Sequence, residues 1–380
     1  MLLAGMKFNL ENIARESLKK KSVIIKKLNA DEIKVFYLGT SIRNTPKPVT
    51  FPKITLLDEN LAENIGMYIG DGKFGSKDMV HSEFITTDED MALFFLNFLK
   101  ERFFIDFSRI SFIIKYRNGH EKALRNKWSD ILKVPVEKFS LQLKHKYNMK
   151  DSITIQVNSV IFTYVFRELI KRALKIIKKD AILRKAFLRG FFAADGKLGV
   201  EKDTNTFYIS EMTFCYNYKT EKWLRDYIIE CLKIEGIKHF NLIQGYIRIT
   251  GWENYLRFWE MRLLDLCARK KNRFLRTINQ MFLYFKLNKN FLSSHLSSTK
   301  ISKNSLLEMF NLHRTNLHRV LDGKQLLRLD QIETFRNVFN IKWKDILSNM
   351  NGIRIGKQTY LNPQEDFINF VIDSRNSRGE

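Results

Sequence analysis

The sequence predicts a mixed α+β protein with an internal duplication, followed by a small all-α unit. A glycine-containing segment with a central Asp-Gly-Lys occurs twice, at residues 66–75 and 190–199. A similar order of helix-like and strand-like segments follows each copy, which indicates two related halves. Three short amphipathic segments between residues 304 and 348 then have the spacing of helices alone.

The composition favours a globular protein that binds a polyanion. The 380 residues are 44% hydrophobic, enough for two or three domains with a sizeable core. The formal net charge is +24, and lysine and arginine recur along the chain instead of forming one tail. Nucleic acid is the natural partner of such a chain, although a lysine-rich, AT-biased genome would also produce a high charge.

Cysteine usage and hydropathy argue against several other classes. The three cysteines are widely spaced without a Cys-x-x-Cys pair, so neither a disulfide framework nor a zinc ribbon is expected. No apolar run approaches the roughly 20 residues that span a bilayer, and the apolar residues 1–4 are too short for a signal peptide. We therefore expect a protein of the reducing cytoplasm that does not bind membranes.

Residues 1–57 are expected to form a basic helix followed by a linker. The segment around residues 10–21 has helical spacing and carries several basic residues. Three of the five prolines, Pro46, Pro48 and Pro52, come next. A proline-rich stretch of this kind is typical of an extended connection before a domain.

The first half is predicted to span residues 58–175. Asp58 is a suitable N-cap for a helix that ends at Asp71-Gly72. Strands are then expected at 79–86, 109–116, 138–146 and 152–157, and further helices at 87–104, around Trp128 and at 158–169.

The second half is predicted to span residues 176–285. Asp180 can cap a helix that ends at Asp195-Gly196. Strands are expected at 206–217 and 238–250, and helices at 219–234 and 252–264. A helical domain at 296–350 and a tail at 351–380, which carries little signal, complete the chain.

Small residues precede both aspartates at helical spacing. They lie four residues apart: Gly66 and Gly70 in the first copy, Gly190 and Ala194 in the second. Each helix therefore presents a strip of small residues on one face, and two such helices can pack with their backbones unusually close. This packing would bring Asp71 and Asp195 together at the same end of the helix pair.

Two adjacent carboxylates repel each other, so a shared cation is expected between Asp71 and Asp195. Mg²⁺ prefers oxygen ligands and keeps several waters, and Mn²⁺ can take its place. Such a site fits a phosphodiesterase, in which metal activates water and stabilises the departing oxygen. In the alternative interpretation, each Asp-Gly merely ends a helix with a left-handed glycine cap. Two copies in register on a strongly basic chain favour the metal site.

With these two motifs, residues 58–280 resemble the LAGLIDADG homing endonucleases of the single-chain, two-motif kind. The resemblance extends to the segments 128–132 and 246–251, and to Pro135 and Phe139. It implies two pseudo-symmetric αββαββα halves whose curved antiparallel sheets form a saddle over the major groove of DNA. The two motif helices would form the interface between the halves.

The resemblance also implies a ligand set. Asp71 would bind metal together with the carbonyl of Gly70, and Asp195 together with the carbonyl of Ala194. The first acid of the family motif is replaced here by Ile69 and Ala193. That position varies in the family and is not the metal ligand.

Basic residues near the scissile phosphates are a further implication of the resemblance. Lys179, just before the second motif helix, and Lys270, after the second half, are the first candidates. Lys73 and Lys197 are rivals, and each of the four could instead belong to a solvated face or anchor a phosphate. Base recognition is expected from strand side chains: Ser82 and Glu83 in the first half, and Tyr208, Ser210, Tyr216 and Asn217 in the second.

Residues 304–348 resemble the Cro/repressor type of helix-turn-helix. The second helix would start near Thr315 and direct Leu317, Val320 and Leu321 toward the core. The residues that would then point toward a major groove are Arg314, Asn316, His318 and Arg319. The alternative is a small helical bundle used only for packing.

The expected function is that of a site-specific endonuclease, acting as a monomer, that cuts double-stranded DNA by Mg²⁺-assisted hydrolysis. One alternative is a WhiA-like transcription regulator, which joins a LAGLIDADG scaffold to a helix-turn-helix and binds DNA without cutting it. Another is an intron maturase that uses the basic surface on RNA. Loss of a motif aspartate would favour either alternative, but both aspartates are present.

Overall fold

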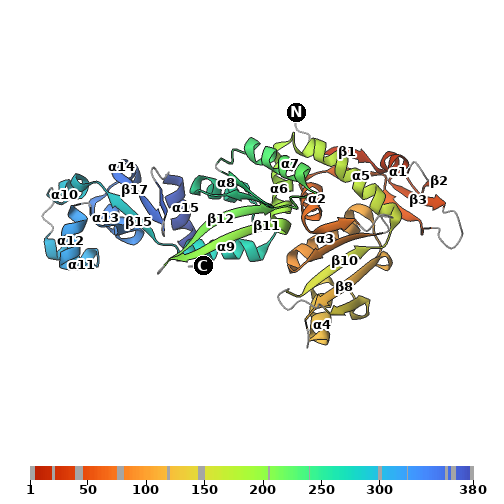
Figure 1. The fold of residues 1–380 in the computed structure, drawn as a ribbon, viewed down its shortest axis with the longest axis horizontal. Helices are drawn as coiled ribbons and strands as arrows, with labels where there is room; N and C mark the ends of the chain where they lie inside the picture. Colours follow the sequence, from red (N-terminus) through yellow and green to blue (C-terminus); the bar gives the residue numbers. More distant parts are fainter. Residues whose placement is uncertain are drawn as a thin grey trace. The chain divides into compact units, whose positions relative to one another are not determined.

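The computed structural model describes residues 5–18, 22–38, 46–74, 81–117, 120–143, 150–203, 206–238, 240–297, 302–322, 324–355, 358–360 and 365–376. Helices and strands both run through the chain, so the mixed α+β class is confirmed. The chain forms two compact units, whose elements are drawn in Figure 1. The first comprises Met1–Lys197, Thr213–Ile249 and Arg257–Lys271, and the second comprises Leu198–Met212, Thr250–Leu256 and Asn272–Glu380.

The N-terminal segment is folded, which differs from the expected linker. Its elements are β1 (Met6–Asn9), α1 (Leu10–Ser17), β2 (Ser22–Lys27), β3 (Glu32–Leu38), β4 (Val49–Pro52) and β5 (Ile54–Leu57). β1 pairs with β5, and β2, β3 and β4 form a three-stranded sheet in that order. Alternating apolar residues such as Ile33 and Val35 are fully buried in this sheet. Pro52 is tolerated because it ends an edge strand, where a missing N–H costs little.

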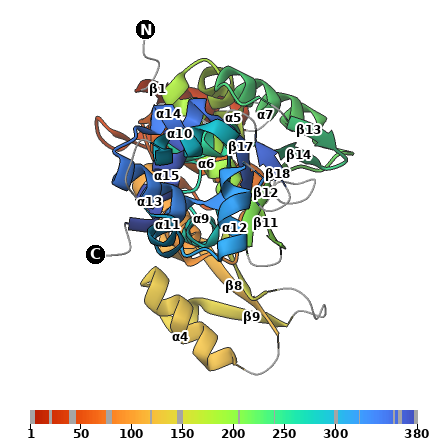
Figure 2. The same cartoon turned by 90° about the vertical axis from the view of Figure 1, so that its left-hand side faces the viewer.

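Residues 58–175, which the sequence predicts as the first half, begin with α2 (Glu59–Asp71) and continue into a five-stranded sheet. Its strands are β6 (Gly72–Phe74), β7 (Ser82–Thr86), β8 (Ile110–Tyr116), β9 (Phe139–Leu143) and β10 (Ser152–Val157), in the order β6-β7-β10-β8-β9. The helices are α3 (Glu89–Phe103), α4 (Glu121–Leu132) and α5 (Val160–Ile177). Figure 2 shows α4 beside β8 and β9. The expected strand residues 79–80 and 144–146 lie outside the described residues.

Phenylalanines fill the core between this sheet and its helices. Phe84 of β7 and Phe95 of α3 are buried, with ring centroids 4.4 Å apart. Phe98 and Phe166 extend the same cluster from α3 to α5. With Ile155 and Phe112, which pair beside Phe84, they make this face of the sheet largely apolar.

Residues 176–285, which the sequence predicts as the second half, begin with α6 (Ala181–Asp195), and the two compact units do not follow this predicted division. It continues through β11 (Gly196–Asp203), β12 (Thr206–Cys215), α7 (Lys222–Ile234), β13 (Phe240–Ile243), β14 (Tyr246–Ile249), α8 (Trp252–Glu260) and α9 (Ala268–Gln280). The four strands form a sheet in the order β11-β12-β14-β13.

The C-terminal part is not all-α, so that prediction is wrong. Four strands form a sheet in the order β16-β15-β17-β18: β15 (Leu283–Leu287), β16 (Leu327–Arg328), β17 (Met350–Ile355) and β18 (Gln358–Tyr360). The helices are α10 (Lys289–Ser297), α11 (Lys303–Met309), α12 (Arg314–Leu321), α13 (Leu329–Phe339), α14 (Trp343–Ser348) and α15 (Glu365–Asn376). Leu283 pairs with Ile355, which is far along the chain, so the local pattern around the three central helices did not indicate this sheet.

Candidate metal site at the interface of two helices

Glycines let α2 and α6 pack with their backbones in contact. A Cβ added to Gly66 would lie 2.2 Å from the carbonyl oxygen of Phe187, and one added to Gly190 would lie 1.9 Å from that of Glu63. Both distances are far below van der Waals contact, so only glycine fits at these crossing points. The strip of small residues therefore performs the role that its spacing predicts.

This packing places Asp71 and Asp195 at the same end of the helix pair. Each is the last residue of its helix, and a Cβ on Gly70 would lie 3.5 Å from the Cβ of Asp195. The following glycines, Gly72 and Gly196, have φ of −93° and −82°, in the extended region. The Asp-Gly pairs are therefore not left-handed caps, and that part of the alternative interpretation is wrong.

The surroundings of the two carboxylates favour their protonated forms. Burial, and then the negative charge of Asp195, raise the pKa of Asp71 to about 7. Burial is also the main cause that raises the pKa of Asp195 to about 6. The positive charge of Lys270 opposes both shifts. The two carboxylates therefore resist being ionised at the same time. A bound cation would stabilise the form in which both are ionised.

Lys270 comes from α9 and holds the end of α6. Its side chain is buried, and its Nζ donates hydrogen bonds to the carbonyl oxygens of Phe192 at 2.7 Å, Ala193 at 2.7 Å and Ala194 at 3.1 Å. A helix C-terminus carries unsatisfied carbonyls and partial negative charge, which an ammonium group complements. Lys270 therefore fixes the backbone that carries Asp195.

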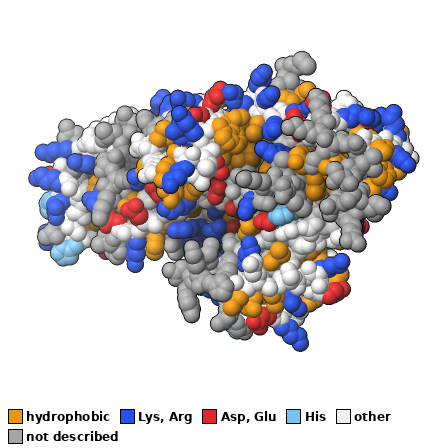
Figure 3. Space-filling model, turned by 45° about the vertical axis from the view of Figure 1, so that its right-hand side comes forward, with side chains coloured by type: hydrophobic (Ala, Val, Ile, Leu, Met, Phe, Trp, Pro, Cys, Tyr) orange, Lys and Arg blue, Asp and Glu red, His pale blue; other side chains and the backbone are white. Residues whose placement is uncertain are grey.

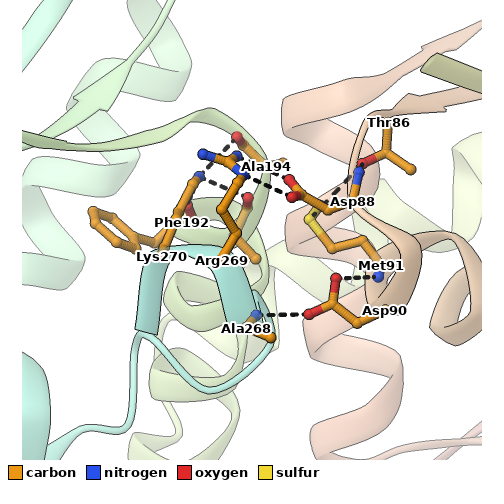
Figure 4. Close-up of polar contacts among 10 residues, drawn as sticks. Thr86, Asp88, Asp90, Met91, Phe192, Ala194, Ala268, Arg269 and Lys270 are labelled. Carbon is orange, nitrogen blue, oxygen red and sulfur yellow. Dashed lines mark hydrogen bonds and ion pairs between the residues drawn. The ribbon is translucent and has the colours of Figure 1, made fainter. Parts of the chain in front are cut away.

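Two acidic residues at the start of α3 anchor the start of α9, as Figure 4 shows. Asp88 accepts two hydrogen bonds from the guanidinium of Arg269, at 2.7 and 2.9 Å. Asp90 accepts one from the backbone N–H of Ala268, at 2.6 Å. Burial opposes ionisation of Asp88, but its bonds and charge interaction with Arg269 hold its pKa below the usual value. The segment before Lys270 is thereby fixed to the first half.

The other three candidate lysines lie in different surroundings. Lys179 is exposed and precedes α6, whereas Asp195 ends it, so about 22 Å of helix separates them. Proximity in sequence to the motif helix was a wrong guide, and Lys179 does not belong to the site. Lys73 and Lys197 are exposed on β6 and β11, each two residues after one of the aspartates.

The first sheet presents a polar face opposite its apolar one. Pairing places four residues side by side across four strands: Lys73, Glu83, Gln156 and Ser111. A second row contains Lys115 beside Ser152 and Gln142. Asn158 links the first row by hydrogen bonds of 2.6 Å to Gln156 and Ser111. Of these residues only Glu83 and Lys73 were named from sequence, although strand alternation could have indicated the others.

Ser82 is on the opposite face of β7 and is not a DNA-contact candidate. Its side chain is buried, and its hydroxyl lies 2.9 Å from the hydroxyl of Thr163 in α5. Adjacent strand residues point to opposite faces, so Ser82 and Glu83 cannot both line the polar face. Glu83 is partly exposed, and His81 lies 2.7 Å from its carboxylate.

Of the second-half candidates, two are buried. Tyr208 donates a 2.7 Å hydrogen bond to Glu201, and Ser210 is 6% exposed, so neither side chain is available to bases. Tyr216 is partly exposed and Asn217 is exposed, immediately after β12. These two are the candidates that the structure leaves accessible.

The residues of α12 that were predicted to contact DNA lie on its accessible face. Arg314, His318 and Arg319 are exposed and Asn316 is partly exposed, whereas Leu317 and Val320 are buried. The burial of Leu317 and Val320 agrees with the predicted orientation of this helix. The side chains of Thr315 and Leu321 lie outside the described residues.

The donors at the helix ends suit a hard divalent cation. Asp71 and Asp195 supply carboxylate oxygens, and the carbonyls of Gly70 and Ala194 lie one residue before them. The Ala194 carbonyl already accepts the longest of the three Lys270 bonds, but a carbonyl oxygen has a second lone pair. Among the described residues no group of three or more His, Cys, Asp and Glu side chains could hold a metal ion. Two carboxylates and two carbonyls would leave room for the waters that Mg²⁺ prefers to keep.

The fold and the site define an α+β protein with paired carboxylates at a helix interface. No family model matches the sequence, and no curated protein matches it. Among solved structures, the chain is similar to that of I-DmoI in complex with DNA and Ca, with 15% sequence identity and a TM-score of 0.30. The alignment covers 57% of this chain and 97% of that one. Within the described residues, no helix is both long and apolar enough to cross a membrane.

Proposed function

We propose that this protein is a homing-type endonuclease that cuts double-stranded DNA at a specific site by divalent-metal-assisted hydrolysis. The observation that carries the proposal is the pairing of Asp71 and Asp195 at the ends of two helices in backbone contact. Their raised pKa values describe a site that a divalent cation would complete. The resemblance of residues 58–280 to LAGLIDADG homing endonucleases supports the same class.

Each residue of the site has a defined part in this proposal. Asp71 and Asp195 would hold Mg²⁺, or Mn²⁺ in its place, with help from the carbonyls of Gly70 and Ala194. When bound, the metal supplies a Lewis acid that activates water and neutralises the departing oxygen. Lys270 fixes the end of α6 and lowers the proton affinity of both carboxylates. Both aspartates come from one chain, so a monomer can supply the complete site.

DNA would lie against basic and polar surfaces. Lysine and arginine side chains recur over the described surface of the face seen in Figure 3, and the net charge is +24. The polar face of the first sheet supplies Lys73, Glu83 and Lys115 for contacts with phosphates and bases. In the second unit, Arg314, His318 and Arg319 of α12 would add further contacts in the manner of a helix-turn-helix.

The cysteines agree with a reducing compartment such as the cytoplasm. Cys215, Cys231 and Cys267 are all free, and the last two are buried. Burial raises the pKa of the Cys267 thiol to about 11, which makes it a weak nucleophile at neutral pH. We assign these residues to packing and not to chemistry.

One observation favours a second candidate, a non-cleaving DNA-binding regulator. Lys270 already places an ammonium group near both aspartates, and this group supplies part of the positive charge that a metal would bring. A protein that has exchanged metal for lysine would bind DNA without cutting it. The two candidates make opposite predictions for the same experiment.

The test is cleavage of a randomised duplex library, followed by sequencing of the new ends. With Mg²⁺ or Mn²⁺, the endonuclease should release ends that share one recurrent sequence. Asp71→Asn should release no such ends, and Asp31→Asn, exposed in the turn between β2 and β3, is the matched control. Tight enrichment of one duplex sequence without any new ends would establish the regulator instead.

A further inference from the structure

We propose a second nucleic-acid site in the first unit, a groove between α5 and α7 that binds single-stranded nucleic acid. The groove has a volume of about 770 Å³ and is lined from α2, β6, α5 and α7. Its size falls in the range of roughly 300–1,000 Å³ that is usual for ligand sites. Phe74 contributes aromatic surface to its lining and packs on the buried Tyr68 behind it. The polar face of the first sheet, described above, is a different surface.

Trp223 supplies a stacking platform at the groove. It is the second residue of α7, it lines the groove, and it is 53% exposed. An indole ring left in water is available for contact with another flat ring. Nucleic-acid bases stack on such rings without regard to sequence, because every base has a π face.

The lining segment of α5 supplies positive charge beside this tryptophan. Arg167, Lys171 and Lys175 recur every four residues, so they share one face of the helix, and all three line the groove. The side chain of Lys171 is 60% exposed. Lys175 is exposed and makes no ion pair with any described residue. This row can follow the phosphates of a strand whose base stacks on Trp223.

The two acidic residues of the groove are already engaged. Glu168 accepts a 3.2 Å hydrogen bond from Arg172 and lies 3.7 Å from Lys171. Glu221 accepts a 2.7 Å hydrogen bond from the backbone N–H of Asn217. These two carboxylates therefore repel a phosphate group in the groove less than carboxylates without such partners would.

An unpaired strand fits this arrangement better than a duplex. A duplex keeps its base faces stacked inside and exposes only base edges, so Trp223 would find no ring to contact. A single strand offers both an open base face and a continuous row of phosphates. The inference does not rest on DNA cleavage, since binding in the groove needs neither Asp71 nor Asp195.

Fluorescence anisotropy of the full-length protein with labelled oligonucleotides tests the groove. The probes are a 12-nucleotide oligo(U), a 12-nucleotide oligo(dT) and a 20-base-pair duplex, each titrated at low salt. The variants are Trp223→Ala, Trp223→Phe and the double variant Lys171→Glu/Lys175→Glu. Lys26→Glu/Lys27→Glu, on β2, is the charge-matched control.

We expect Trp223→Ala and the Lys171/Lys175 variant to weaken single-strand binding about tenfold or more. Trp223→Phe should lose less, and the control should keep wild-type affinity apart from a small change in salt dependence. Duplex affinity should be unchanged by Trp223→Ala. Binding of oligo(U) alone would identify RNA as the ligand, and equal binding of both probes would identify single strands of either kind.

Three results would overturn the inference. The first is wild-type protein that binds neither single strand. The second is Trp223→Ala protein that binds them as tightly as wild type. The third is an equal loss of duplex and single-strand affinity in Trp223→Ala, which would assign the tryptophan to the duplex surface or to folding. Circular dichroism and the Tm of each variant separate the folding explanation from the other.

Discussion

Lys270 donates a 2.7 Å hydrogen bond to the carbonyl oxygen of Ala193, two residues before Asp195. A side chain from α9 thereby ends a helix of the second half and fixes the backbone next to a candidate catalytic carboxylate. The same ammonium group lowers the proton affinity of Asp71 and Asp195. Lys270 therefore affects the site in two ways: its hydrogen bonds fix the backbone near Asp195, and its charge favours the ionised forms of both aspartates.

Lys270→Met is expected to affect both stability and the pH dependence of activity. Three carbonyls lose their donor, so the free energy of unfolding should fall by roughly 2–4 kcal/mol. Loss of the positive charge raises the pKa of both aspartates, so the rising limb of the cleavage–pH profile should move to higher pH. Lys271→Met, one residue along and partly exposed, is the matched control. An unmoved profile in Lys270→Met would show that the lysine acts on folding alone.

Asp71→Asn should stabilise the metal-free protein at alkaline pH. Because the pKa of Asp71 is raised from 3.8 to about 7, the folded state binds the proton more tightly than the unfolded state does. The contribution of this group to stability is therefore highest at low pH and is lost as pH rises from about 4 to about 7. The neutral asparagine avoids this loss, and we expect a gain on the order of 2 kcal/mol at pH 8 that disappears at pH 4.

Urea unfolding at both pH values, with a chelator present, measures this difference. Asp106→Asn is the opposite-sign control, because the hydrogen bonds that its carboxylate accepts from Ser108 hold the pKa of Asp106 below its usual value. That variant should lose stability at pH 8 and not gain it. Equal stability of wild type and Asp71→Asn at pH 8 would show that burial and the charge of Asp195 do not raise the pKa of Asp71 in the folded protein.

Gly190→Ala should separate the two motif helices. The added methyl group would lie 1.9 Å from the carbonyl oxygen of Glu63, and backbone cannot move aside as a flexible side chain can. We expect a loss of about 3 kcal/mol and a lower Tm, together with weaker cleavage. Gly236→Asn is a suitable control, because Gly236 has φ of +78° and nothing within 4 Å of an added Cβ. Full stability in Gly190→Ala would contradict the close packing of α2 and α6.

Lys115→Gln should reduce duplex binding and its salt dependence. Lys115 lies on the polar face of the first sheet, beside Ser152 and Gln142. If it contacts one phosphate, the slope of log affinity against log salt should fall by about 0.9.

Ser82→Ala should instead leave DNA affinity unchanged and lower the free energy of unfolding by about 1 kcal/mol, because the Ser82 hydroxyl bonds to Thr163 in the core. If Ser82→Ala weakened DNA binding and Lys115→Gln did not, the face of the sheet that carries Ser82 would be the one that contacts DNA.

The two motif helices could be predicted from the sequence because their signals are local. Asp58 caps α2 through a 2.9 Å bond from Leu61, and Asp180 caps α6 through bonds from Ile182 and Leu183, as predicted. Both helices end at the predicted aspartates. Caps, small-residue spacing and helix ends depend on neighbours within four residues, which a sequence displays directly.

Apart from the packing of the two motif helices, features that depend on distant pairing were not predicted. The contact between Asp88 and Arg269 joins residues 181 positions apart, and no local pattern indicates it. Ser82 was placed on the wrong face because a shift of one residue reverses every side chain of a strand. The sheet formed by β15 and β17 was missed because its strands lie on either side of the central helices. Each error comes from register or topology and not from the residue types.

The central claim is that Asp71 and Asp195 form one shared site, and single-turnover cleavage with each strand labelled separately tests it most directly. The duplex would carry the sequence recovered from the library, with Mg²⁺ present. We predict that Asp71→Asn and Asp195→Asn each abolish cutting of both strands while duplex affinity stays within about threefold of wild type. A variant that still cuts one strand at the wild-type rate would contradict the shared site, because the two carboxylates would then act independently.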